Sequence, residues 1–200
     1  MRRVIFIILI FGVIGTVLGL VVTRNTANSV ISNIPIPVSE RNPEVSPTQQ
    51  PRAGIPTQLV IPQLSVDAPV EQVGLDAQKR MDVPKVVTNT GWYMYGPRPG
   101  EKGNSVIAAH FDTPTGAPSV FYDLAKLSPG DTIEVSDDQN QTHTFVVDKV
   151  TTFPTDDFPI DLVFGASDTA HLNLITCGGS WDKNKRIYDE RVVVFSHLEK

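Results

Sequence analysis

The stretch LNLITCGGSWDKNKRIYDERVVVF, residues 172–195, contains the only cysteine of the chain. An apolar run precedes Cys177, two glycines follow it, and a second apolar run, VVVF, comes after a polar segment. Short β-branched runs separated by turn residues are typical of β-strands. We therefore expect two strands here, with Cys177 closing the first and Arg191 opening the second.

Similar runs recur from residue 58 onward and predict a mainly β domain, an all-β barrel or sandwich. They are QLVIPQL (58–64), APVEQV (68–73), SVIAAH (105–110), DTIEVS (131–136), HTFVVDKV (143–150), HLNLIT (171–176) and RVVVFSHL (191–198). In SVFYDLAKL, residues 119–127, the apolar residues have helical spacing before the breaker SPGD. This segment predicts a short helix that covers part of the barrel.

The N-terminus predicts a membrane anchor. Residues 4–23 carry no charge, and about twenty helical residues span the roughly 30 Å hydrocarbon core. Arg2 and Arg3 precede this segment and Arg24 alone follows it, which favours a cytoplasmic N-terminus. We expect residues 1–3 inside the cell and the rest of the chain outside. The alternative is a cleaved signal peptide, for which only Ala27 offers a small residue near a cleavage site.

Residues 24–57 are rich in Pro, Ser, Asn, Thr and Gln and show no helical or strand periodicity. Six prolines bias this segment toward an extended tether that holds the following domain, residues 58–200, away from the bilayer. The formal net charge of -5 and the lack of a long Lys/Arg cluster argue against a nucleic-acid partner. With four histidines and one cysteine we expect no metal, no cofactor and no intramolecular disulfide.

The lone thiol has two interpretations. A free cysteine is often a small apolar filler of the core. However, Cys177 stands at the predicted end of a strand and before GGS, where backbone N–H groups such as that of Gly178 can turn toward a bound carbonyl. Outside the cytoplasm an unpaired thiol also risks oxidation. Both points favour a nucleophile.

A cysteine nucleophile needs an acid–base partner, and His110 is the best candidate. His143, His171 and His197 lie within ordinary strand-like runs, where solvent-facing positions explain them. His110 instead ends the run SVIAAH and precedes the Gly/Pro-rich segment FDTPTGAP. Its imidazole should therefore emerge where a strand becomes a loop, and adjacent strands can bring positions 110 and 177 together.

These motifs carry a family resemblance. VIAAHFDTPTGAPSVFYDLAKLSPGDTIEV (106–135), LNLITCGG (172–179) and ERVVVF (190–195) resemble the sortases, cysteine transpeptidases of bacterial cell surfaces, and look most like class F members. LVIPQLSVDAPVEQVGLD (59–76), GWYMYGPRPGEKGN (91–104) and the anchor with its tether extend the resemblance. The family motif TLxTC reads NLITC here, so Asn173 replaces its first Thr.

The resemblance implies a closed sortase β-barrel with His110, Cys177 and an arginine at its rim. Sortases carry that arginine where the final strand begins, which points to Arg191, while Arg186 lies in the preceding loop. The implied reaction is cleavage of a Leu-Pro-x-Thr-Gly-like sorting signal between Thr and Gly through a thioacyl enzyme. The acyl group then passes to an amine of a cell-wall precursor or a pilin. The expected location is the bacterial cell membrane, with the domain extracytoplasmic.

Other residues are candidates for supporting roles. Asp112 either orients the imidazole or caps the turn into TPTG, and Thr176 alternates away from Cys177 and should pack beneath the site. Trp181 is either a loop anchor or a lining of the groove. Residues 151–167 occupy the place where sortases build the wall that reads Leu-Pro, with apolar contacts from Phe153, Phe158 and Val163.

Two other functions stay open on the sequence. A sortase-like hydrolase would cleave its acyl intermediate without transferring it to an amine. A non-catalytic surface-binding barrel would bury Cys177 as an inert thiol.

Overall fold

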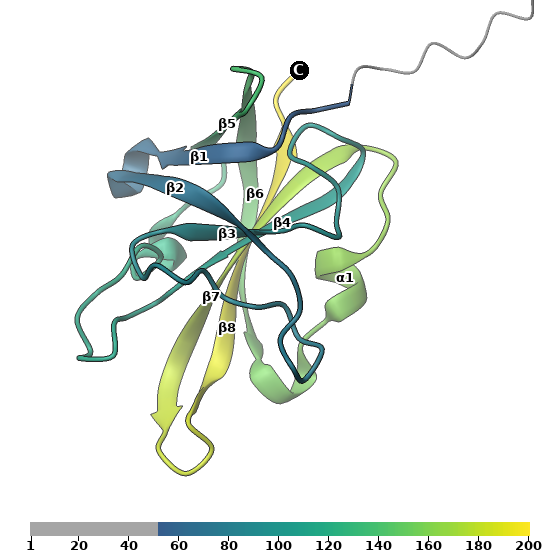
Figure 1. Ribbon diagram of the computed structural model, residues 1–200. Coiled ribbons are helices and arrows are strands. Elements are labelled where there is room, and N and C mark those ends of the chain that lie inside the picture. The colour runs from purple at the N-terminus through teal and green to yellow at the C-terminus, as the bar shows by residue number, and fades with distance from the viewer. Residues whose placement is uncertain (1–51) are drawn as a thin grey trace, which may run out of the picture. The chain divides into compact units, whose positions relative to one another are not determined.

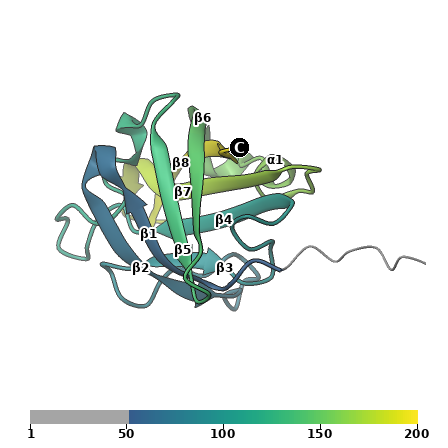
Figure 2. The same cartoon turned by 90° about the horizontal axis from the view of Figure 1, so that it is seen from above.

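The computed structural model describes residues 52–200, whose strands close into a barrel in the order β1-β2-β3-β4-β7-β8-β6-β5 (Figure 1). The strands are β1 (Pro56–Ile61), β2 (Val66–Val73), β3 (Thr90–Tyr93), β4 (Gly103–Ala109), β5 (Thr132–Asp137), β6 (Thr142–Pro154), β7 (Ala170–Asp182) and β8 (Ile187–Leu198). Seen from above, β5 and β6 cross β4 and β7 at a steep angle (Figure 2). The predicted mainly β barrel is confirmed.

Each of the seven predicted runs overlaps a strand, but β3 was not predicted. It has only four residues, and three of them are buried, so it lacks the alternation that marks a half-buried strand. It pairs in parallel with β2 and antiparallel with β4. This short strand is needed to close the barrel between β2 and β4.

The predicted helix at residues 119–127 is present only as a 3-10 turn, η2 (Leu124–Lys126). Its apolar residues still fill the barrel, because Phe121 and Leu124 are fully buried. The other helical elements are also short: η1 (Pro62–Leu64), η3 (Thr155–Asp157) and α1 (Ile160–Phe164). The helical spacing thus identified core residues and overestimated the helix.

β7 and β8 are covered on both faces. Leu172, Leu174, Val192 and Val194 point into the barrel core, where each fully buried side chain contributes roughly 1.5–3 kcal/mol. The intervening residues belong to a second apolar cluster outside the barrel, under the segment between β6 and β7; they are Ile175, Val193 and Phe195, which pack with Val106 and Val163. This two-sided burial explains the continuous apolar runs in the sequence.

β1 begins at Pro56, two residues before the predicted start of the domain. The carboxylate of Asp137, which is 5% exposed, accepts hydrogen bonds from the backbone N–H groups of Gly54, Gln139 and Gln141, each at 2.9 Å. Burial opposes ionisation, but these donors outweigh it and hold the pKa of Asp137 below its ordinary value. The end of the predicted tether is thus fixed to the barrel.

Asp137→Ala should lower the free energy of unfolding by about 3 kcal/mol at pH 7, because three backbone donors, one of them at the buried Gly54, lose a charged acceptor. A carboxyl whose folded-state pKa is depressed stabilises above its unfolded pKa of about 3.9 and loses that contribution as pH falls through the folded value. Urea unfolding at pH 7 and pH 3 should show the difference between variant and wild type shrinking at pH 3. Asp138→Ala, which loses one exposed acceptor, is the matched control. Equal losses in both variants would contradict this prediction.

The predicted membrane anchor at residues 4–23 and most of the predicted tether lie outside the described residues. Within residues 52–200, no helix has the length and apolar character needed to cross a bilayer.

Candidate active site

The three residues predicted for catalysis meet on the outer face of β4, β7 and β8. Cys177 pairs directly with Arg191 across the antiparallel β7–β8 ladder. β4 and β7 run parallel, and their last pair is Ala108 with Ile175, so His110 and Cys177 each follow it by two residues. Because neighbouring strands lie about 4.8 Å apart, this register brings His110, Cys177 and Arg191 side by side.

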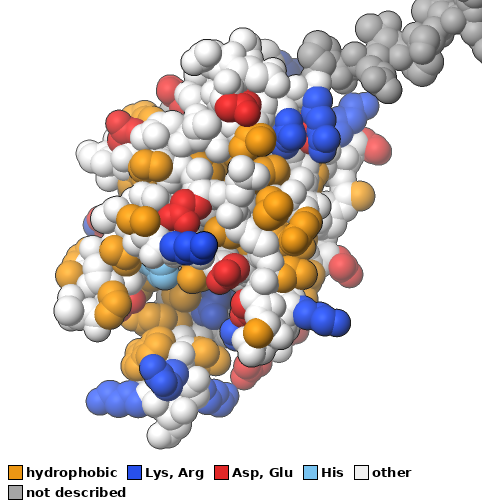
Figure 3. Space-filling view, in the orientation of Figure 1, with side chains coloured by type: hydrophobic (Ala, Val, Ile, Leu, Met, Phe, Trp, Pro, Cys, Tyr) orange, Lys and Arg blue, Asp and Glu red, His pale blue; other side chains and the backbone are white. Residues whose placement is uncertain are grey.

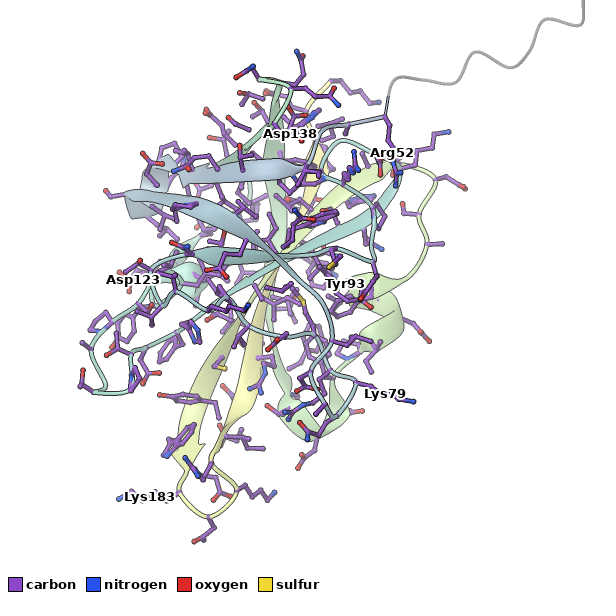
Figure 4. The ribbon with its side chains drawn as sticks, viewed as in Figure 1. Arg52, Lys79, Tyr93, Asp123, Asp138 and Lys183 are labelled. Atoms are coloured by element: carbon purple, nitrogen blue, oxygen red, sulfur yellow. The ribbon has the colours of Figure 1, made fainter. Side chains whose placement is uncertain are left out.

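Cys177 does not end its strand and Arg191 does not open the next one, so both of these sequence predictions are wrong. β7 continues to Asp182 and β8 begins at Ile187, so the two form a long hairpin (Figure 1). Lys183 marks its tip (Figure 4). The register shifts between Gly178 and Trp181, and Gly179 has a φ of 75°, so the glycines form a bulge instead of a chain end. A bulge at this place bends β7 and changes the direction of the side chains that follow Cys177.

Thr176 lies beneath the site, as the alternation predicted. Its side chain is buried, and its hydroxyl donates a 3.0 Å hydrogen bond to the carbonyl of Ala109. This bond joins β7 to β4 at the residues that precede Cys177 and His110. It therefore stabilises the spacing between nucleophile and imidazole.

Arg191 is held by one end of its guanidinium group. Nη1 donates to the carbonyl of Glu190 at 2.7 Å, to the hydroxyl of Thr155 at 3.0 Å and to the carbonyl of Tyr188 at 3.1 Å. Thr155 itself donates to the carbonyl of Tyr188 at 2.9 Å. Within residues 52–200 no hydrogen bond is found from Nε or Nη2. These bonds orient the planar guanidinium group, and its Nε and Nη2 donors stay available to a ligand.

His110 is held by the segment between β2 and β3. Its Nε2 lies 3.2 Å from the carbonyl oxygen of Pro84, which is buried. Because a carbonyl can only accept, Nε2 carries a proton in this arrangement. A second contact holds the same segment, since the Ser119 hydroxyl donates to the carbonyl of Val87 at 2.7 Å. No pattern in the sequence indicates either contact.

A groove of about 900 Å³ opens beside His110. One wall is the segment 82–87 and the other is the segment 112–116, and Trp181 and Tyr188 of the hairpin line it as well. Cys177 and Arg191 do not line this groove. The space-filling view shows a histidine side chain in a hollow above the hairpin, bordered by apolar and charged side chains (Figure 3). Trp181 is thus a groove residue, one of its two predicted roles.

Asp112 binds a residue that the sequence did not single out. Tyr188 of β8 donates a hydrogen bond of 2.5 Å from its hydroxyl to Oδ2 of Asp112. This bond, and then burial, raise the pKa of Tyr188 to about 12, so the phenol stays a donor at any physiological pH. Within residues 52–200, no hydrogen bond is found from the Asp112 carboxylate to the turn TPTG or to the His110 imidazole. The carboxylate instead joins the loop after β4 to the hairpin.

The environment of Cys177 favours the thiol over the thiolate at rest. Burial raises the pKa of Cys177 above its ordinary value, the charge of Arg191 lowers it, and the charge of Asp112 raises it. Burial dominates, so the resting side chain is protonated at neutral pH.

Two charge-removing variants should therefore move the pKa of Cys177 in opposite directions. Arg191→Ala removes the stabilising cation and should raise it, whereas Asp112→Asn removes the opposing anion and should lower it. The pH dependence of alkylation by iodoacetamide measures both shifts. Shifts of the same sign would contradict the assignment. A thiol that stays unreactive even at pH 10 would indicate an inert core cysteine.

The predicted apolar wall lies over the outer face of β7 and β8. Val163 of α1 is fully buried there, and Phe153 and Phe158 pack against the same cluster. Asn173 holds this wall, because its side-chain amide donates a 2.7 Å bond to the carbonyl of Val163. The residue that departs from the TLxTC pattern thus has a structural role in this chain.

Tyr188 and Thr155 are the residues of the site that sequence reasoning missed. Tyr188 stands in the polar stretch RIYDE, and Thr155 in a run of acidic and proline residues, so neither has a pattern that indicates a contact with Arg191. The only available signal was position: a tyrosine three residues before the arginine, within the same strand.

Comparisons with known proteins identify the family and the fold. The Sortase domain model matches residues 59–199. Sortase C-1 from Actinomyces oris is 22% identical, with a TM-score of 0.56 over 72% of this chain and 71% of its own. Sortase C1 from Streptococcus agalactiae is 24% identical, with a TM-score of 0.55 over 72% and 67%. A lid mutant of sortase A from Corynebacterium diphtheriae is 20% identical, with a TM-score of 0.56 over 77% and 74%.

At these identities the solved structures show a shared fold, and the predicted class F membership stays a prediction, since the relatives named are sortases C and A. No curated protein matches the chain significantly. The family model covers well over half of the residues. This chain belongs to the sortase family.

Proposed function

We propose that this protein is a membrane-anchored cysteine transpeptidase that cleaves a Leu-Pro-x-Thr-Gly-like sorting signal between Thr and Gly. The acyl group is then transferred to an amine of a cell-wall precursor or a pilin. The observation that supports this most is the placement of the chain's only cysteine directly opposite Arg191 and on the strand next to His110.

In the first half-reaction, Sγ of Cys177 attacks the Thr carbonyl carbon while the thiol proton passes to His110. The C–N bond to glycine breaks, and His110 protonates the departing amine, which leaves a thioacyl enzyme. The unbonded donors of Arg191 and backbone N–H groups near Cys177 and Gly178 stabilise the oxyanion.

In the second half-reaction, His110 accepts a proton from the incoming amine, whose nitrogen attacks the thioester and releases Cys177 as a thiol. The groove between segments 82–87 and 112–116 supports a route for this amine, because His110, which accepts the amine's proton, lies in its lining.

The cluster under α1 suits the apolar end of the signal. Ile175 and Val193 lie two residues from Cys177 and Arg191, on the same outer face, beneath Val163 and the two phenylalanines of the wall. A Leu-Pro segment bound along this cluster would place the following Thr carbonyl near Cys177.

A single-pass anchor at residues 4–23 with the domain outside the cell follows from the sequence and belongs to this proposal. Protease added to intact cells should then reach the domain, and a mature protein that begins near Asn28 would show cleavage instead.

Full-chain protein in detergent, incubated with a library of sorting-signal peptides and several amines, tests the function by mass spectrometry. A peptide joined to the amine through its Thr carbonyl, with release of the glycine fragment, is the expected product. Cleavage without joining would support the hydrolase. Absence of both cleavage and a thioacyl adduct on Cys177 would reject an enzymatic role.

A further inference from the structure

Tyr188 lies on β8, the strand that carries Arg191, and its side chain reaches the segment that carries His110. Its hydroxyl donates to Asp112 at 2.5 Å, two residues after His110. Its backbone carbonyl accepts from Nη1 of Arg191 at 3.1 Å and from the hydroxyl of Thr155 at 2.9 Å. Tyr188 thus contacts Arg191 directly and also contacts Asp112, which lies two residues after His110.

The ring of Tyr188 is packed so that its hydroxyl has little freedom. It makes edge contacts with Trp181, at a centroid distance of 5.1 Å, and with Phe111, at 5.5 Å. Phe111 in turn stacks on Tyr122 at 4.7 Å. Since Phe111 stands between His110 and Asp112 in the chain, this aromatic cluster and the hydrogen bond hold the same short segment.

The Asp112–Tyr188 bond joins the loop after β4 to the outer part of the hairpin, beyond the Thr176–Ala109 bond that joins β7 to β4. Backbone hydrogen bonds tie His110 and Phe111 to residues 119–121 of their own loop. Within residues 52–200, no other hydrogen bond is found between segment 110–118 and the hairpin residues 178–190. Without it, residues 110–118 would be joined to hairpin residues 178–190 by ring packing alone, and the Thr176–Ala109 bond would be left to hold the ends of β7 and β4 together.

Resting on the transpeptidase function proposed above, we propose that Tyr188 is a positioning residue, which fixes His110 relative to Cys177 and Arg191 through the bond from its hydroxyl to Asp112. The bond sets the distance over which His110 exchanges protons with the thiol and the amines. Small displacements of an acid–base group lower the rate of chemistry far more than they weaken the binding of a substrate held elsewhere.

Tyr188→Phe removes only the hydroxyl and keeps the ring contacts. In the full-chain protein, kcat for a sorting-signal peptide should fall about tenfold, with KM within about twofold of wild type, because a hydrogen bond to a charged group is lost. Tyr122→Phe is the matched control: it removes a hydroxyl from the same aromatic cluster, and no hydrogen bond from that hydroxyl is found within residues 52–200.

Two variants of Asp112 separate the effect of losing the hydrogen bond to Tyr188 from the effect of losing the carboxylate charge. Asp112→Asn keeps an oxygen that accepts from Tyr188 but loses the charge that raises the pKa of Cys177, so its kcat should fall clearly less than that of Asp112→Ala, which loses both. Asp112→Ala removes the acceptor and should match Tyr188→Phe. The double variant Tyr188→Phe with Asp112→Ala should be no slower than either single variant, because both break one bond.

Wild-type kinetics in Tyr188→Phe would overturn this inference, and so would a kcat in Asp112→Asn as low as that in Asp112→Ala, which would assign the effect to charge. Should Tyr188→Phe fold poorly, as judged by its melting temperature, the two Asp112 variants still decide between these outcomes. Failure of the proposed function is distinguishable, because then the wild-type protein itself forms neither an acyl adduct nor a transfer product.

Discussion

Replacing Cys177 by alanine is expected to reduce peptide turnover by about 10⁴-fold or more while leaving the barrel folded. The chain contains no second thiol that can form the thioacyl intermediate. The side chain is only partly buried and points outward from the ladder, so removing one sulfur atom should cost about 1 kcal/mol or less of folding free energy. Mass spectrometry of transfer products and thermal unfolding measure the two effects.

Ser180→Ala is the matched control for this variant, since it removes a small polar atom from an exposed residue of the same strand. It should keep both activity and stability. Substantial turnover by Cys177→Ala would reject the covalent mechanism. Strong destabilisation of that variant would instead favour a packing role for the thiol.

Arg191→Ala should lower kcat by about 10²–10³ with little change in KM, because the contacts of the guanidinium with the substrate strengthen as the oxyanion develops. Arg191 stands opposite Cys177 in the ladder, and Thr155 and two carbonyls orient its Nη1. Arg191→Lys should recover only part of the rate, because an ammonium keeps the charge and loses the planar fork of donors.

Arg186→Ala is the control for this prediction. Arg186 is exposed in the turn of the hairpin, with a φ of 57°, and would have to give up conformational freedom to reach the site. Steady-state kinetics on both alanine variants with one peptide decide the assignment. A larger loss in Arg186→Ala would contradict it.

Strands whose sequence shows an apolar run or period-two alternation were predictable, and β3, which shows neither, was not. β5 alternates buried and partly buried residues and shows a period of two in its sequence, whereas β7 is buried on both faces from Leu172 to Thr176 and shows as an apolar run. β3 has four residues and no alternation, and only its pairing with β2 and β4 makes it a strand. Glycines 178 and 179 indicate a strand end in the sequence, yet the ladder absorbs them as a bulge.

The candidate nucleophile and its acid–base partner were predictable from the sequence itself. One cysteine and one histidine at a strand-to-loop boundary restrict these two roles, because few residue types can perform them, whereas Arg191 was implied by the resemblance to sortases. Period-two alternation also predicted that Thr176 points away from Cys177, and its bond to Ala109 agrees.

Only the tertiary structure decided what holds these groups in place. Pro84 contacts His110 across 26 positions of sequence, Thr155 contacts Arg191 across 36, and Tyr188 contacts Asp112 across 76. Such contacts depend on how the barrel closes and on the paths of three loops. Alternation along a strand sets the face on which a side chain lies, but the register between strands and the course of each loop set which distant group it meets.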